Sequence, residues 1–121
     1  MTTHERLKAE RDILALASSF GPRGHGDNHA AWSRLESYAD ALIASGWLRR
    51  EVLDVIEDVY SKNVESLPPA GDDALSNYLS GLTGECSPEG IVRFPGDPED
   101  PREFILYVRG REWMKRNEDV R

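Results

Sequence analysis

His25, Asp27 and His29 alternate along one glycine-rich stretch, and their types and spacing come closest to a metal site in this sequence. Imidazole nitrogens and carboxylate oxygens bind divalent metals. No further ligand follows at a recognisable spacing, and the HExxH, CxxC, GxGxxG and GxxxxGK[ST] patterns are absent. We therefore expect a capped loop between two helices, with no metal and no other cofactor. A metal-binding domain centred on this loop is kept as an alternative.

Cys86 is the only cysteine, which excludes an internal disulfide and a Cys-rich zinc site and fits a reducing cytoplasm. Its neighbours Glu85 and Glu89 make the loop acidic, and an acidic loop is not the setting that activates a thiol. The other carboxylates belong to no catalytic motif. We therefore expect that the chain is not an enzyme.

The acidic side chains are concentrated in the middle of the chain. The 121 residues include 15 basic and 22 acidic side chains, for a formal net charge of −7. Residues 51–101 hold 12 acidic and 2 basic side chains and so carry −10, whereas residues 1–50 carry +1 and residues 102–121 carry +2. This balance argues against direct binding of nucleic acid, which needs basic side chains. The acidic block is either a set of solvated faces or a surface that attracts a basic partner.

No apolar run approaches the roughly 20 residues that span a bilayer, and the N-terminus does not resemble a secretory signal. We therefore expect a cytoplasmic protein with no membrane contact. The length suits one domain of about 100–150 residues.

Helical periodicity and end signals predict four helices, over 3–19, 29–45, 48–63 and 72–83. Thr2 and Glu5 form a capping-box pattern, Asp27 or Asn28 caps the second helix, and Asp72-Asp73 caps the fourth. The predicted inward residues are Leu7, Ile13, Leu14, Ala17 and Phe20; Trp32, Leu35, Ala39 and Leu42; Leu48, Val52, Val55, Ile56 and Val59; and Leu75, Tyr78, Leu79 and Leu82.

Residues 90–109 are rich in β-forming residues, so a C-terminal hairpin and an α+β fold are one alternative. However, Asp100, Pro101 and Glu103 form a strong helix start, with an N-cap, a proline at N1 and an acidic N3. We therefore predict an all-α fold: a small bundle of about five helices with a short 3-10 or extended segment near 91–94. The last helix is expected to begin at Pro101 and to carry Trp113 in its second half.

From residue 48 onward, several features follow one another in a fixed order. They are an acidic helix over 48–63, a second helix ending at Leu82-Thr83, an acidic loop, an apolar segment over Gly90–Pro95, an acidic turn over Gly96–Asp100, and a helix from Pro101 towards Trp113. This order resembles the immunity proteins that neutralise nuclease bacteriocins of the colicin E and S-type pyocin group. The resemblance covers residues 48–117. Where that family has two tyrosines that pack against the nuclease, this sequence has Arg93 and Phe94.

The resemblance implies a four-helix region over 48–117, to which residues 1–47 add a two-helix extension within a single domain, 1–121. It also implies a small acidic inhibitor protein that binds and neutralises a basic nuclease by covering a site next to its active site. Phe94 would be the apolar anchor, and the acidic residues would set partner choice. The contact residues implied are Asp72, Asp73, Asn77, Glu85, Glu89, Arg93, Phe94 and Glu99.

Other readings of the same charge pattern stay open. A phage-encoded antagonist of a host nucleic-acid-binding defence complex would use its acidic face to imitate a nucleic-acid backbone. A helical domain with a structural or assembly role would be acidic for solubility alone. The sequence predicts neither the oligomeric state nor the role of residues 1–47.

Overall fold

Residues 2–114 are described by the computed structural model, and they contain five α-helices, one short 3-10 helix and no strand. The all-α prediction is therefore confirmed, and the hairpin over 90–109 is wrong. The sequence-based 48–117 region reaches beyond the described residues at 115–117. The helices are α1 (Thr3–Ser18), α2 (Asp27–Ala44), α3 (Arg49–Asn63), α4 (Pro69–Thr83), η1 (Pro88–Gly90) and α5 (Pro101–Arg109).

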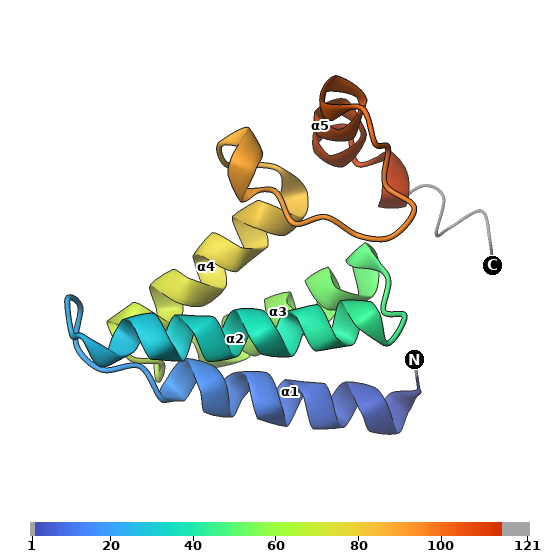
Figure 1. Ribbon diagram of the computed structural model, residues 1–121. Helices are drawn as coiled ribbons and strands as arrows, with labels where there is room; N and C mark the ends of the chain where they lie inside the picture. Colours follow the sequence, from blue (N-terminus) through green and yellow to red (C-terminus); the bar gives the residue numbers. More distant parts are fainter. Residues whose placement is uncertain (1, 115–121) are drawn as a thin grey trace.

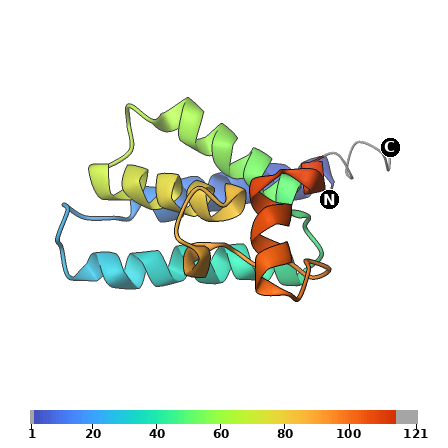
Figure 2. The ribbon, with the colours of Figure 1, turned by 90° about the horizontal axis from the view of Figure 1, so that it is seen from above.

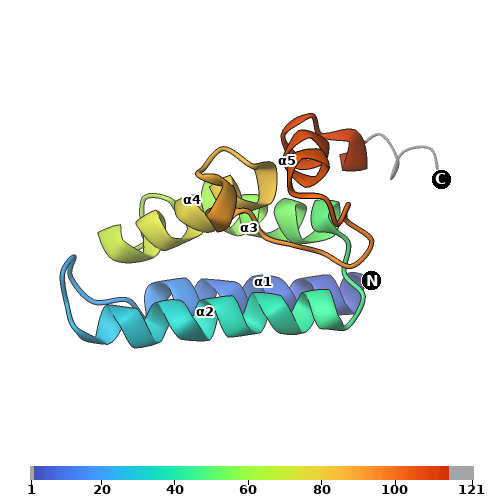
Figure 3. The same cartoon turned by 45° about the horizontal axis from the view of Figure 1, so that its top comes forward.

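The helices form two layers, and α5 closes one end (Figures 1 and 3). One layer is the antiparallel pair α1 and α2, and the other contains α3 and α4. Seen from above in Figure 2, α5 runs across the end of the bundle where α3 begins and α4 ends. Buried side chains from both layers, among them Ile13, Leu35, Ile56 and Leu75, belong to one hydrophobic cluster. Residues from the 1–47 segment therefore share a core with residues from the rest of the chain.

The starts of α1 and α5 follow the predicted capping patterns. The Thr2 hydroxyl oxygen accepts a hydrogen bond from the backbone N–H of Glu5 at 3.1 Å. The Asp100 carboxylate accepts from the backbone N–H of Glu103 at 3.1 Å, and Pro101 occupies N1. Because Asp100 ends the extended connection and begins a helix, residues 101–109 cannot form the second strand of a hairpin.

The starts of α2 and α4 differ from the predictions. The residue before α2 is Gly26, which has no capping side chain. The Asn28 amide instead closes the preceding loop, accepting from Gly21 N–H at 2.8 Å and donating to Pro22 C=O at 2.8 Å. Helix α4 begins at Pro69, because proline fits the first position of a helix, so Asp72 and Asp73 lie inside the helix rather than capping it.

Three apolar positions also differ from the predictions. Leu7 is 55% exposed because the buried stripe of α1 runs through Ala9, Ile13 and Ala17 instead. Leu48 is 52% exposed because it precedes α3 with an extended backbone, where helical periodicity does not apply. Trp113 is buried as expected for a packing residue, but it lies beyond the end of α5, which stops at Arg109. Arg111, with φ 56°, interrupts the helical path before Trp113.

No helix among residues 2–114 is both long enough and apolar enough to cross a membrane.

We predict that a carboxylate between α1 and α2 makes stability depend on acid pH. Asp12 Oδ2 accepts hydrogen bonds from Lys8 Nζ and from the Tyr38 hydroxyl, each at 2.7 Å, and these bonds lower the pKa of Asp12. A lowered folded-state pKa stabilises the protein above the unfolded-state value and loses that contribution as pH falls through the folded-state value. Asp12→Asn should therefore lower the free energy of unfolding at pH 7 by about 1 kcal/mol or less.

The difference between Asp12→Asn and the wild type should shrink as the pH falls below about 4. Urea unfolding at pH 7 and pH 3 measures it, with Glu57→Gln, an exposed position on α3, as the control. A difference that is constant between the two pH values would show that Asp12 makes no charge-dependent contribution.

Candidate partner-binding surface

The predicted contact residues follow α4, η1 and the connection to α5, which are yellow to orange in Figure 1. Six of them are exposed: Asp73, Asn77, Glu85, Glu89, Arg93 and Glu99. We call these six residues the acidic edge. The other two predicted contact residues are less accessible to a partner: Asp72 is half-buried and Phe94 is buried.

Asp72 and Asp73 point toward different neighbours and do not form a joint acidic patch. The nearby Asp72 carboxylate raises the pKa of the Tyr60 hydroxyl on α3. Asp73 accepts from the Arg23 guanidinium of the α1–α2 loop, with Nε to Oδ2 at 2.8 Å and Nη2 to Oδ1 at 3.3 Å. The Arg23 guanidinium lowers the pKa of Asp73. Only Asp73 therefore belongs to the side of α4 that faces residues 20–32.

Four arginines that lie outside residues 51–101 pair with acidic residues inside that block. These contacts bring together positions that are far apart in the sequence, so they do not show in a count of charges along the chain. The folded surface is consequently less negative than the −10 of residues 51–101 suggests. The pairs are Arg6–Asp58, Arg23–Asp73, Arg49–Asp97 and Arg111–Glu85.

Phe94 is 6% exposed and belongs to the hydrophobic core. Its ring lies under the Arg49 guanidinium, 4.5 Å from the guanidinium carbon to the ring centroid. In this structure Phe94 packs in the core, so its ring is not presented to a partner as the apolar anchor that the resemblance implies. The reason is that the connection turns back at residue 94, so the aromatic side chain fills the space beside the start of α3 instead of facing solvent.

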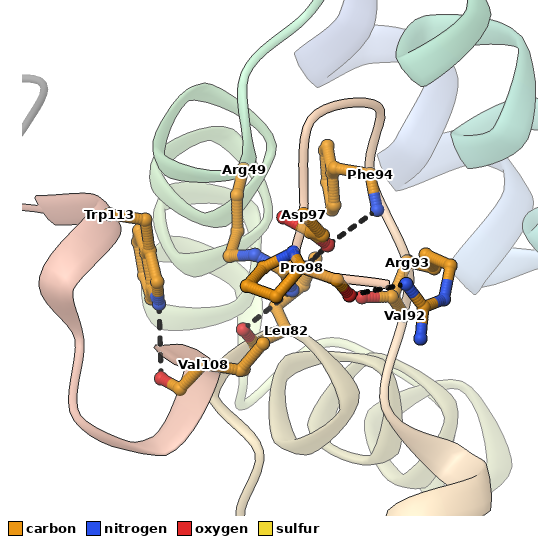
Figure 4. Close-up of polar contacts among 9 residues, drawn as sticks. All are labelled: Arg49, Leu82, Val92, Arg93, Phe94, Asp97, Pro98, Val108 and Trp113. Carbon is orange, nitrogen blue, oxygen red and sulfur yellow. Dashed lines mark hydrogen bonds and ion pairs between the residues drawn. The ribbon is translucent and has the colours of Figure 1, made fainter. Parts of the chain in front are cut away.

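A buried ion pair holds the connection between α4 and α5 in place (Figure 4). Arg49 Nη2 lies 2.6 Å from Asp97 Oδ2, and the two side chains are only 3% and 6% exposed. The same guanidinium donates to the carbonyl of Leu82 at 3.1 Å and to that of Val92 at 2.7 Å. Burial lowers the pKa of Arg49 and Asp97 opposes that shift, but a guanidinium keeps its charge in proteins. One side chain at the start of α3 thus fixes the end of α4 and the connection.

Local chemistry explains the tight turn beside this ion pair. Pro95 and Gly96 occupy the two central positions of a turn that the Asp97 N–H to Phe94 C=O hydrogen bond closes at 3.1 Å. Gly96 has φ +88°, the left-handed region that glycine adopts at no steric cost, and proline suits the position before it. Asp97 Oδ2 also accepts from the Phe94 N–H at 2.8 Å. The turn therefore aims Asp97 inward at Arg49.

Arg93 contacts its own connection and the final helix. Its Nη1 donates to the Pro98 carbonyl at 2.9 Å, and its guanidinium carbon lies 3.9 Å from the centroid of the Phe104 ring. The neighbouring Glu89 and Glu99 are therefore presented from a backbone that is held at several points.

A pocket of about 240 Å³ opens between the α1–α2 loop, α2 and α4, and two acidic-edge residues line it. Phe20, Trp32, Ala70 and Ala74 form its apolar part. Its polar part consists of Arg23, Asn28, Asp73 and Asn77, together with the backbone of Gly24. Because Phe20, Arg23, Gly24, Asn28 and Trp32 all precede residue 48, the two-helix extension supplies half of this pocket.

Sequence reasoning missed both the ion pair and the pocket. The sequence did contain a signal for the ion pair. Arg49 lies one turn before Val52 and Leu53, on the buried side of α3, and a buried arginine needs an acidic partner. No comparable signal identified Asp97 as that partner. The pocket depends on how the α1–α2 loop meets α4, which no local pattern specifies.

The glycine-rich loop contains no assembled metal site. His25 Nδ1 accepts from the Asp27 N–H at 3.2 Å, and the Asp27 carboxylate is 3.9 Å from the same nitrogen. Within residues 2–114, no group of three or more His, Cys, Asp or Glu side chains could hold a metal ion. Cys86 is half-buried, and its backbone carbonyl accepts from Arg109 at 2.9 Å.

The described residues form a small all-α domain with an exposed carboxylate at Asp73 on α4 and three more, at Glu85, Glu89 and Glu99, after that helix. No family model, curated protein or solved structure matches the chain.

Proposed function

We propose that this chain is a small acidic inhibitor that binds a basic nuclease of the bacteriocin type and neutralises it by covering a site next to its active site. The observation that carries the proposal is the order α3, α4, η1 and α5, four helical elements in the region where the resemblance implies four helices. Of the exposed carboxylates of the acidic edge, Asp73 lies on α4, Glu85 between α4 and η1, Glu89 on η1 and Glu99 on the connection that follows.

Charge explains how such an inhibitor would work. Glu85, Glu89 and Glu99 are exposed, so they would attract a basic protein surface and speed its association. Once the complex has formed, the same carboxylates and the bulk of the domain would repel and exclude the phosphates of a nucleic acid. Inhibition by this route needs no catalytic group and no cofactor on the inhibitor.

Rigidity of the connection supports the same function. The Arg49–Asp97 pair and the Arg93 contacts already order residues 92–98 in the unbound chain. A surface that is ordered before binding loses less conformational entropy when the partner docks. We expect the inhibitor to act in the cytoplasm, where the Cys86 thiol stays reduced.

Charge reversal on the acidic edge should slow association with the partner. We expect Glu89→Lys/Glu99→Lys to reduce the association rate with the protein captured from the native host by about tenfold at low ionic strength. Stopped-flow mixing at 0.01 M and 1 M salt measures this rate, and the difference should largely vanish in 1 M salt, where charges are screened within about 3 Å.

The matched control is Glu5→Lys/Glu112→Lys, which makes the same change of charge at exposed positions outside residues 51–101. Equal slowing by the two double variants would mean that net charge alone governs association. In that case the acidic edge would not be the binding surface.

A further inference from the structure

The pocket beside α4 combines aromatic walls with one carboxylate, Asp73, and one guanidinium, Arg23. Phe20 is 7% exposed and Trp32 is half-buried, so both contribute apolar surface to a pocket of about 240 Å³. A cavity of about 150 Å³ is large enough to hold benzene, so this pocket has room for one long side chain. The faces of aromatic rings attract cations, and guanidinium groups stack on them especially well.

The charges around the pocket also favour a cation. Asp73 lies on the rim of the pocket. The negative charge of Asp72, the preceding residue of α4, contributes to raising the pKa of Arg23. On α2, Glu36 and Asp40 lie one and two helical turns after Trp32. Burial raises the pKa of Tyr78 on α4, and the negative charges of Asp40 and Glu36 raise it further, so both carboxylates lie near this part of α4. Arg23 is the one basic residue in the lining. Asp73 in the lining and the nearby Asp72, Glu36 and Asp40 thus outnumber the guanidinium of Arg23.

Arg23 shows how a guanidinium fits at this rim. Its Nε and Nη2 reach the two carboxylate oxygens of Asp73, the two-pronged geometry that arginine forms with carboxylates. The pair is exposed, with 68% and 50% of the two side chains accessible, and exposed ion pairs are weak and exchangeable. The Asn28 amide holds the backbone of Gly21 and Pro22, so the Arg23 side chain can leave without unfolding the loop.

We propose that this pocket receives an arginine side chain of the partner protein, stacked on Trp32 and paired with Asp73 in competition with Arg23. The inference rests on the proposed function only in assigning a basic protein partner. It gives the two-helix extension a role in binding, because the extension supplies Phe20, Arg23 and Trp32. It also supplies the apolar contact that buried Phe94 does not offer.

A titration with a single arginine unit tests the pocket without any partner. The ¹⁵N-labelled full-length chain is titrated with N-acetyl-arginine methylamide and, separately, with the neutral isostere N-acetyl-citrulline methylamide. We expect saturable shifts of the Trp32 indole N–H and of the Gly24 and Asp73 amides with the arginine compound only. The Trp113 indole, whose Nε1 donates to the Val108 carbonyl at 3.0 Å, should not shift and reports that the fold is intact.

Two variants distinguish the pocket from general acidity. Asp73→Asn should abolish saturation over the same concentration range. Arg23→Ala should bind the arginine compound about threefold more tightly, because a weak exposed competitor has been removed. Equal shifts with the citrulline compound, shifts spread over all exposed carboxylates, or weaker binding by Arg23→Ala would each overturn the proposal.

This titration contains no nuclease, so its failure would leave the proposed inhibition standing. Conversely, a chain that binds the arginine compound in this pocket but inhibits no nuclease would retain the inference and lose the proposed function.

Discussion

Replacing Arg49 with methionine should lower the free energy of unfolding by about 3–5 kcal/mol, the cost of removing one partner of a buried ion pair. The Asp97 carboxylate is 6% exposed and would be left charged without its guanidinium. The carbonyls of Leu82 and Val92 would also lose a donor. Urea unfolding followed by far-UV circular dichroism measures the change.

The double variant Arg49→Met/Asp97→Asn should recover part of this loss. Asparagine removes the uncompensated charge and still offers an oxygen to the Phe94 N–H that Asp97 now binds. Arg34→Met, an exposed arginine on α2, should stay within about 0.5 kcal/mol of the wild type. An Arg49→Met protein as stable as Arg34→Met would show that the ion pair does not hold the connection.

Gly71→Ala should destabilise the protein by about 3 kcal/mol, at the upper end of the usual cost of overpacking. A Cβ atom at this position would lie 2.1 Å from the Ala17 carbonyl oxygen and 3.0 Å from the Ala17 carbonyl carbon. Both atoms are backbone, so α1 and α4 would have to separate. Helix propensity alone predicts the opposite sign, since alanine is favoured over glycine by about 1 kcal/mol inside a helix.

Gly26→Ala provides the comparison, because nothing lies within 4 Å of an added Cβ there and its φ is −57°. We expect it to change the free energy of unfolding by less than about 1 kcal/mol. If Gly71→Ala were neutral or stabilising in the same thermal and urea unfolding experiments, α1 and α4 would not approach each other as closely as the structure places them.

Local signals predicted the helices well because capping and periodicity act over a few residues. Thr2 and Asp100 cap α1 and α5 as their patterns indicate. The short 3-10 or extended segment predicted near 91–94 corresponds to the 3-10 helix η1 at Pro88–Gly90 and to the residues without helix or strand that follow it. The misplaced start of α4 is also local: Asp72-Asp73 looked like a cap, but Pro69 three residues earlier is the better first helical residue.

The candidate surface was harder to predict because its charges and rings are set by tertiary contacts. Nothing near Asp97 in the sequence indicates that it pairs with Arg49, 48 positions away. The resemblance implies that Phe94 is an apolar anchor, yet the turn at Gly96 directs the chain so that its ring packs beneath Arg49. Charge counted along the chain therefore overstated the negative surface, and the resemblance gave no sign that Phe94 is buried.

The role of residues 1–47 could not be predicted from local sequence patterns either. Their two helices were predicted, but their role was not, because the pocket that they share with α4 exists only once the α1–α2 loop meets Asp73.

Inhibition of nucleic-acid cleavage is the measurement that tests the central claim most directly. The nuclease captured by this chain is titrated with the purified full-length protein while cleavage of a DNA or RNA substrate is followed. We predict that cleavage falls to background at one inhibitor per nuclease, and that Glu89→Lys/Glu99→Lys needs a higher concentration for the same effect. Cleavage that continues unchanged while the nuclease is saturated with this protein would contradict the account.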